Sequence, residues 1–172
     1  MTTKLYYFKN AWTRQRKALD KKEKEIYTRD CGMKIDLLNL NWIYRAKKYY
    51  HMLPPDIYLM TIPIHYRIKV DEFKALVEAP TVDQFMQLLA NTYYENRFHA
   101  MQRSEGMEQF YKACIHGMYL SDRRRNPYSL ATVNTYLFLK EEEINRLTTA
   151  LECIRYGLTP RETLGYIGGA KK

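Results

Sequence analysis

Apolar and polar positions recur with helical spacing through the stretch 36–50. At about 100° per residue, Asn41, Arg45 and Lys48 fall in one narrow polar sector. The rest of the circumference carries two apolar sectors, one of Leu37, Leu40 and Tyr44 and one of Leu38, Trp42 and Tyr49. Because a helix that is apolar on most sides needs several packing partners, this stretch predicts the central helix of the fold.

Two polar residues, Asp36 and Asn39, interrupt the apolar surface three positions apart, on a common face of this helix. A buried polar group without a partner costs about 1–3 kcal/mol, so both side chains must be hydrogen-bonded if they are buried. We expect them to hold the end of a neighbouring segment. Gly32, one turn earlier, predicts a bend or a close contact with another helix.

Capping and turn residues divide the chain into helices. Asp20 followed by Glu23 predicts an N-cap with a capping box, and the pair of prolines at 54 and 55 ends the long helix. Ser104 and Ser129 predict two further N-caps, and Gly157 is typical of the position just after a helix. The predicted helices span about 3–19, 21–50, 55–60, 71–78, 105–123 and 130–156, with others starting at Val82 and Pro160. The segment 62–68 is unusually apolar for a loop and is expected to lie against the core, whereas 91–103 is ambiguous.

These elements predict an all-α fold, a helical bundle of long and short helices. We expect two units, residues 1–95 around the central long helix and residues 96–172 with the final long helix and a short C-terminal helix. A Leu-x-Pro turn follows both long helices, at Leu53 and at Leu158, and a short helix begins after each turn. This indicates a weak internal repeat, although the shared chemistry of helix ends could produce the same pattern.

The chain has 172 residues and a net charge of +9, with 46% hydrophobic residues, enough to bury a sizeable core. A solvated lysine-rich surface without a special role can account for such a charge. Binding to a nucleic acid, an anionic membrane surface or an acidic protein can account for it as well. The apolar runs are too short to span a bilayer, and the first residues do not have the pattern of a signal peptide. Three widely separated cysteines indicate reduced thiols in a cytosolic protein.

Motifs of catalysis are missing from the sequence. It has no glycine-rich phosphate loop, no nucleophile elbow and no metal-ligand spacing among its histidines and cysteines, so we expect no catalytic residue, no cofactor and no metal. The run Arg123, Arg124 and Arg125 is either a plain charged turn at a helix end or a docking point for an acidic partner. Basic and aromatic residues interleave in 4–24 and 45–50, a mixture that can bind nucleic acid. The tyrosines recur at helical spacing with leucines, however, which favours packing in a core or groove over nucleic-acid binding.

Several short motifs occur in an order and spacing that resemble a known family. They are Tyr6-Tyr7-Phe8 to Trp12, Asp36-x-x-Asn39, the Arg45–Tyr49 run, Leu53-Pro54-Pro55-Asp56 and Ile62-Pro63, and later Asn126-Pro127-Tyr128, Glu143-Ile144 and Gly157-Leu158-Thr159-Pro160-Arg161-Glu162. Together they resemble the second half of the C subunits of V-type and A-type ATPases (ATP synthases), a family whose members in eukaryotic pumps are called d subunits. Seven residues of these motifs are the ones that the resemblance marks as structurally important, and we call them the family-motif residues: Asp36, Asn39, Arg45, Pro55, Pro63, Glu143 and Pro160.

The resemblance implies an all-helical mechanical part. Members of the family lie between the rotating central stalk of a proton- or sodium-translocating ATPase and its membrane proteolipid ring. They transmit torque and have no catalytic site. We therefore expect a non-catalytic connector, or socket, at the cytoplasmic face of the membrane, with stalk and ring proteins as partners and no small-molecule substrate. The alternative is a basic helical nucleic-acid-binding protein.

Overall fold

The computed structural model describes residues 3–95 and 106–168, and these residues form eight helices and no strand. The all-α prediction is therefore confirmed for the described part of the chain. In chain order the helices are α1 (Thr3–Ala18), α2 (Lys21–Tyr50), α3 (Pro54–Met60), α4 (Val70–Glu78), α5 (Val82–Leu89), α7 (Met107–Arg125), α8 (Leu130–Arg155) and α9 (Pro160–Tyr166).

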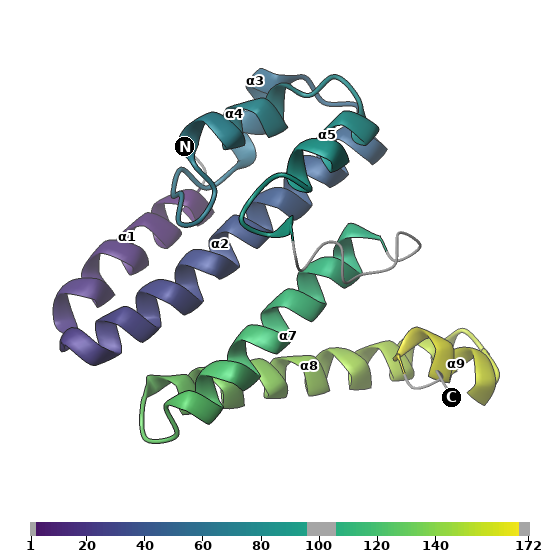
Figure 1. The fold of residues 1–172 in the computed structure, drawn as a ribbon. Coiled ribbons are helices and arrows are strands. Elements are labelled where there is room, and N and C mark those ends of the chain that lie inside the picture. Colours follow the sequence, from purple (N-terminus) through teal and green to yellow (C-terminus); the bar gives the residue numbers. More distant parts are fainter. Residues whose placement is uncertain (1–2, 96–105, 169–172) are drawn as a thin grey trace.

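The 30-residue helix α2 is the centre of the arrangement, as the sequence predicts. It packs against α1, α3, α5, α7 and α8. Figure 1 shows α1 alongside α2, with α3, α4 and α5 grouped beside the C-terminal part of α2. Helix α7 lies alongside α2 and runs in the opposite direction, and α8 leaves the end of α7 in a new direction, with α9 at the far end of α8 (Figure 1).

The main core forms where α2 meets α4, α5 and α7. Leu37 and Leu40 of α2 are fully buried there, together with Leu76 of α4, Phe85 of α5 and Phe110 of α7. A smaller cluster joins Ile35 of α2 to Ile62 and Ile64 of the loop after α3. The prediction that the apolar segment 62–68 lies against the core is thus confirmed.

One of the two apolar sectors of α2 is less buried than the sequence predicts. Leu37, Leu40 and Tyr44 are buried, but Leu38 and Trp42 are only half-buried. Tyr49, in the last turn of α2, is exposed. The sequence pattern predicts which residues share a face of the helix. How deeply each face is buried depends on which other segments pack against each turn.

Local capping chemistry sets several of the observed helix ends. Thr81, Ser129 and Thr159 each accept a hydrogen bond from a backbone N–H in the first turn of the following helix. Gly157 has a φ of +72°, which places a left-handed residue directly after Tyr156, the C-cap of α8, as expected. The Thr159–Glu162 capping box is also present, with Pro160 as the first residue of α9.

Only one of the two hydrogen bonds of the capping box predicted at the start of α2 is present. Asp20 accepts from the Glu23 N–H at 2.8 Å, but the Glu23 carboxylate does not return to the Asp20 backbone. It accepts instead from the N–H of Leu130, also at 2.8 Å. A tertiary contact thus replaces the local one, and it holds the first residue of α8 against α2.

Helix α7 differs from the predicted range 105–123. Its N-cap is Gly106, while the predicted cap, Ser104, lies outside the described residues. At the other end the helix continues through Arg125, two residues beyond the predicted end at about Arg123. The reason is that Pro127 restricts only the residue before it, Asn126, which is the C-cap.

The two long helices end in related corners. His51 closes α2 with a φ of +48°, Gly157 follows α8 with a φ of +72°, and a seven-residue helix with proline in its first turn comes next in each case. The local similarity that the sequence indicates is therefore present. The division of the chain at residue 95 stays a prediction.

Candidate functional site

The carboxylate of Asp36 is buried and fixes the turn at residues 66–68. Its Oδ1 accepts from the N–H of Tyr66 at 3.1 Å, and its Oδ2 accepts from the N–H of Arg67 at 2.7 Å and of Ile68 at 3.3 Å. The Tyr94 hydroxyl donates to the same Oδ2 at 3.2 Å. Burial raises the pKa of Asp36, and these donors, which favour the ionised carboxylate, offset part of that rise.

Asn39, one turn later, pairs with a single backbone unit. Its Nδ2 donates to the carbonyl of Ile62 at 2.9 Å, and the Ile62 N–H donates to Asn39 Oδ1 at 2.8 Å. Both residues are buried. Asp36 and Asn39 therefore hold the loop after α3 on the surface of α2, in agreement with the expectation from their positions.

The other family-motif residues lie on separate elements. Pro55 is in the first turn of α3, Pro63 is exposed in the loop after it, and Pro160 begins α9. Arg45 is exposed on α2, beside a hollow of about 540 Å³ between the end of α2 and the start of α7. Glu143 is exposed on α8 and accepts from Lys140 at 2.6 Å. Only Asp36 and Asn39 act on a common segment, so a joint role for the whole set stays a prediction.

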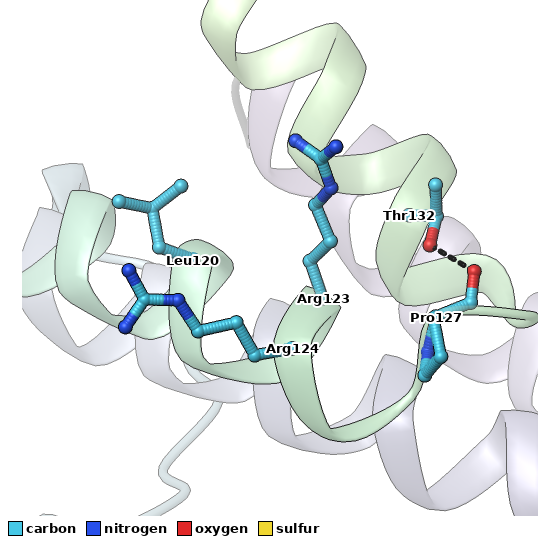
Figure 2. A pocket seen from close by; sticks show the side chains of 5 residues that line it. All are labelled: Leu120, Arg123, Arg124, Pro127 and Thr132. Atoms are coloured by element: carbon cyan, nitrogen blue, oxygen red, sulfur yellow. Dashed lines mark hydrogen bonds between the residues drawn. The ribbon is translucent and has the colours of Figure 1, made fainter.

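The basic run Arg123, Arg124 and Arg125 forms the last turn of α7 and is exposed. Arg123 and Arg124 line a hollow of about 490 Å³ with Leu120, Pro127 and Thr132. Figure 2 shows their side chains leaving the helix end in different directions, while Thr132 donates to the Pro127 carbonyl across the turn. Cations at a helix C-terminus complement the helix dipole, and their exposure here also makes them available to an acidic partner.

A buried charged cluster at the junction of α2, α7 and α8 is absent from the sequence-based predictions. Arg29 Nε donates to Asp122 Oδ2 at 2.8 Å and lies 3.9 Å from Asp30 Oδ1. The amide of Asn134 donates to Asp30 Oδ2 at 3.1 Å. A signal exists in the sequence, since Asp30 follows Ile26 by four positions and precedes Met33 by three, which places a carboxylate on an apolar stripe. Asp122 likewise follows Met118 by four positions, on the apolar side of its helix.

Two carboxyl groups share one guanidinium in this cluster. Asp30 is 1% exposed and Asp122 is 3% exposed. Burial raises the pKa of Asp30 to about 7, and the neighbouring Asp122 adds to the rise because a proton on Asp30 removes a like-charge contact. At neutral pH Asp30 is therefore close to its own pKa, and a proton on Asp30 strengthens the junction of the three helices.

Stability is expected to fall as the pH rises toward neutrality. The pKa of Asp30 in the fold lies above its unfolded value, so its contribution is present in mild acid and is lost as the pH passes the folded pKa. Between about pH 5.5 and about pH 8 the loss from this group amounts to about 2 kcal/mol. Asp30→Asn, which keeps the side chain's size, should flatten this pH profile in urea unfolding.

The matched control for this profile is Asp71→Asn, at an exposed position in the first turn of α4. It should leave the pH dependence of the unfolding free energy as in the parent chain. A parent chain that is at least as stable at about pH 8 as at about pH 5.5, with Asp30→Asn following the same curve, would contradict the role given to Asp30.

The described residues offer no metal-binding group of three or more His, Cys, Asp or Glu side chains. Among the helices of residues 3–95 and 106–168, none combines the length and the apolar character that a membrane span requires. The polar groups that are most buried serve to join segments of the chain, through Asp36, Asn39 and the Arg29–Asp30–Asp122 cluster.

Comparison with models of known protein families gave a match over nearly the whole chain. The sequence model of a family described as ATP synthase (C/AC39) subunit matches residues 1–166. Comparisons with curated proteins and with solved structures gave no match.

Proposed function

The chain belongs to the ATP synthase (C/AC39) subunit family, and on that premise we propose that it connects the central stalk of a rotary ATPase to the membrane proteolipid ring. Members of this family are generally non-catalytic parts of an ATPase complex. The match over residues 1–166 carries the proposal. The connector would act at the cytoplasmic face of the membrane and pass torque between its two partners.

Long, well-braced helices support a mechanical role. With a rise of about 1.5 Å per residue, α2 is about 45 Å long and α8 about 39 Å. The tie from Glu23 to Leu130 and the Arg29–Asp122 ion pair join these two helices and α7 at one junction. Such a joint resists relative rotation of the helices, which a part that transmits torque requires. In this proposal the connector consists of two helical units, residues 1–95 and residues 96–172.

The exposed charge supports the choice of partners. Arg123, Arg124 and Arg125 present three cations at the corner between α7 and α8. In the proposal they contact an acidic surface of a neighbouring protein of the complex. The net charge of +9 also suits a protein held near anionic lipid headgroups, which attract basic groups within about a Debye length.

The test is capture of partner proteins by the tagged chain from detergent-solubilised membranes that contain a V-type or A-type ATPase. We expect stalk and proteolipid-ring proteins in the bound fraction. The triple variant Arg123→Glu, Arg124→Glu and Arg125→Glu should reduce the yield at least about tenfold and leave the helical circular dichroism unchanged, because these side chains are exposed.

The matched control reverses three exposed lysines at the start of α2, with Lys21→Glu, Lys22→Glu and Lys24→Glu. It carries the same change in net charge and should retain the yield. A folded parent chain that captures neither stalk nor ring proteins would overturn the proposal. So would ATP hydrolysis by the pure chain, while a steep salt-dependent mobility shift with nucleic acid would favour the alternative function.

A further inference from the structure

Helix α8 carries a second apolar stripe on its exposed side. Its apolar residues recur at alternating intervals of three and four, with a single lysine at one position of the series. This is the a/d pattern of a coiled-coil heptad repeat. The exposed members of the series are Val133 (52%), Leu137 (59%), Ile144 (61%), Leu147 (59%), Leu151 (67%) and Ile154 (66%). We call these residues and Lys140 the α8 seam.

The seam is separate from the face that holds α8 to the rest of the fold. Ala131, Thr135 and Cys153 are the buried residues of α8, and Phe138 packs against the main core. Ile144 follows Thr135 by nine residues, which at about 100° per residue places it on the opposite side of the helix. The packing of α8 on its neighbours therefore leaves the seam uncovered.

A stripe of this length and regularity is typical of a surface that pairs with another helix. Scattered apolar residues on a protein surface need no explanation, but contiguous ones mark interaction sites. The four positions Ile144, Leu147, Leu151 and Ile154 follow one another without a polar interruption. They offer four core layers to a partner helix.

We propose that the partner is α8 of a second copy of this chain, packed antiparallel, so that Ile144 meets Ile154 and Leu147 meets Leu151 of the other copy. In a parallel pair Lys140 would face Lys140 within the seam, which is unfavourable. The antiparallel register places Lys140 outside the four layers. It also brings Glu141 of each copy within reach of Arg155 of the other, and both residues are at e positions beside the seam.

The pairing has the two-fold symmetry of an isologous dimer, so each complementary contact occurs twice. Glu141 and Arg155 are both exposed on α8 and can form these contacts without breaking the packing on α7. The inference is independent of the proposed function, since it rests only on the surface of α8.

The test is the mass of the purified full chain in solution, measured by sedimentation over a dilution series. We expect a reversible dimer. The variant Leu147→Glu with Leu151→Glu should be monomeric throughout the series, with the helical circular dichroism of the parent, because both side chains are exposed in the single chain. The matched control Leu53→Glu with Leu59→Glu changes two equally exposed leucines at α3 and should still dimerise.

A charge exchange tests the register. Glu141→Arg and Arg155→Glu should each weaken association about tenfold, because two symmetry-related pairs become like-charge contacts. The double variant should restore it. A parent chain that stays monomeric at its highest concentration would overturn the proposal and assign the seam to a different helix. A dimer that survives the Leu147→Glu and Leu151→Glu changes would overturn it as well.

Discussion

Asp36→Ala is expected to lower the free energy of unfolding by about 3–5 kcal/mol, a large effect for a single substitution. The carboxylate accepts from three consecutive backbone N–H groups and from the Tyr94 hydroxyl, and it is 1% exposed. Each donor left unsatisfied in a buried place costs about 1–3 kcal/mol. Alanine would also free the turn at 66–68, which carries the chain from α3 to α4. Urea unfolding monitored by circular dichroism measures the loss.

Asp36→Asn is the informative comparison. Its amide oxygen can still accept, but its Nδ2 presents hydrogens to backbone groups that are themselves donors, so only part of the network survives. The loss of stability should therefore be smaller than that caused by Asp36→Ala. If Asp36→Ala costs no more than about 1 kcal/mol, the network does not hold the turn as described.

Gly32→Ala is expected to destabilise the chain by about 2–3 kcal/mol, although the same change inside a helix usually stabilises by about 0.5–1 kcal/mol. Gly32 is buried in α2. A Cβ at this position would lie 2.5 Å from Cγ of Tyr66 and 2.8 Å from its Cβ. These atoms are close to the Tyr66 backbone, which Asp36 holds in place, so they cannot easily move away. The predicted close contact at Gly32 is therefore present, but with a loop residue rather than a helix.

Gly117→Ala in α7 is the matched control for this substitution. Gly117 is also inside a helix, but a Cβ there would meet nothing within 4 Å. It should stabilise by about 0.5–1 kcal/mol. Tyr66→Ala should make Gly32→Ala less costly in a double-mutant cycle, because removal of the ring relieves most of the overlap. If Gly32→Ala and Gly117→Ala change the free energy of unfolding equally, a steric role for Gly32 is excluded.

Most helices and their ends could be predicted from the sequence because their signals are local. Helix α2 spans Lys21–Tyr50, the predicted range, and Ser129 and Thr159 act as the N-caps that their positions indicate. A cap, a proline or a left-handed glycine acts within one turn of itself. Where a distant residue competes, the local prediction fails, as when the Leu130 N–H draws the Glu23 carboxylate away from its capping box.

The candidate site could be predicted only in part. Two polar residues on an apolar face, Asp36 and Asn39, imply hydrogen-bonded partners, but the sequence does not say which ones. Their partners lie 23 to 58 residues away. The ion pair of Arg29 with Asp122 spans 93 residues; the local pattern indicates a carboxylate on an apolar stripe but not its partner.

The helical class of this protein, the central place of α2 and the positions where the chain turns follow from the amino-acid order, because periodicity and capping are properties of neighbouring residues. The folded arrangement is needed to learn which apolar faces are covered, which carboxyl group has a pKa near 7, and that the α8 seam stays exposed. Burial and charge proximity depend on segments brought together from distant parts of the chain, and no local pattern encodes those distances.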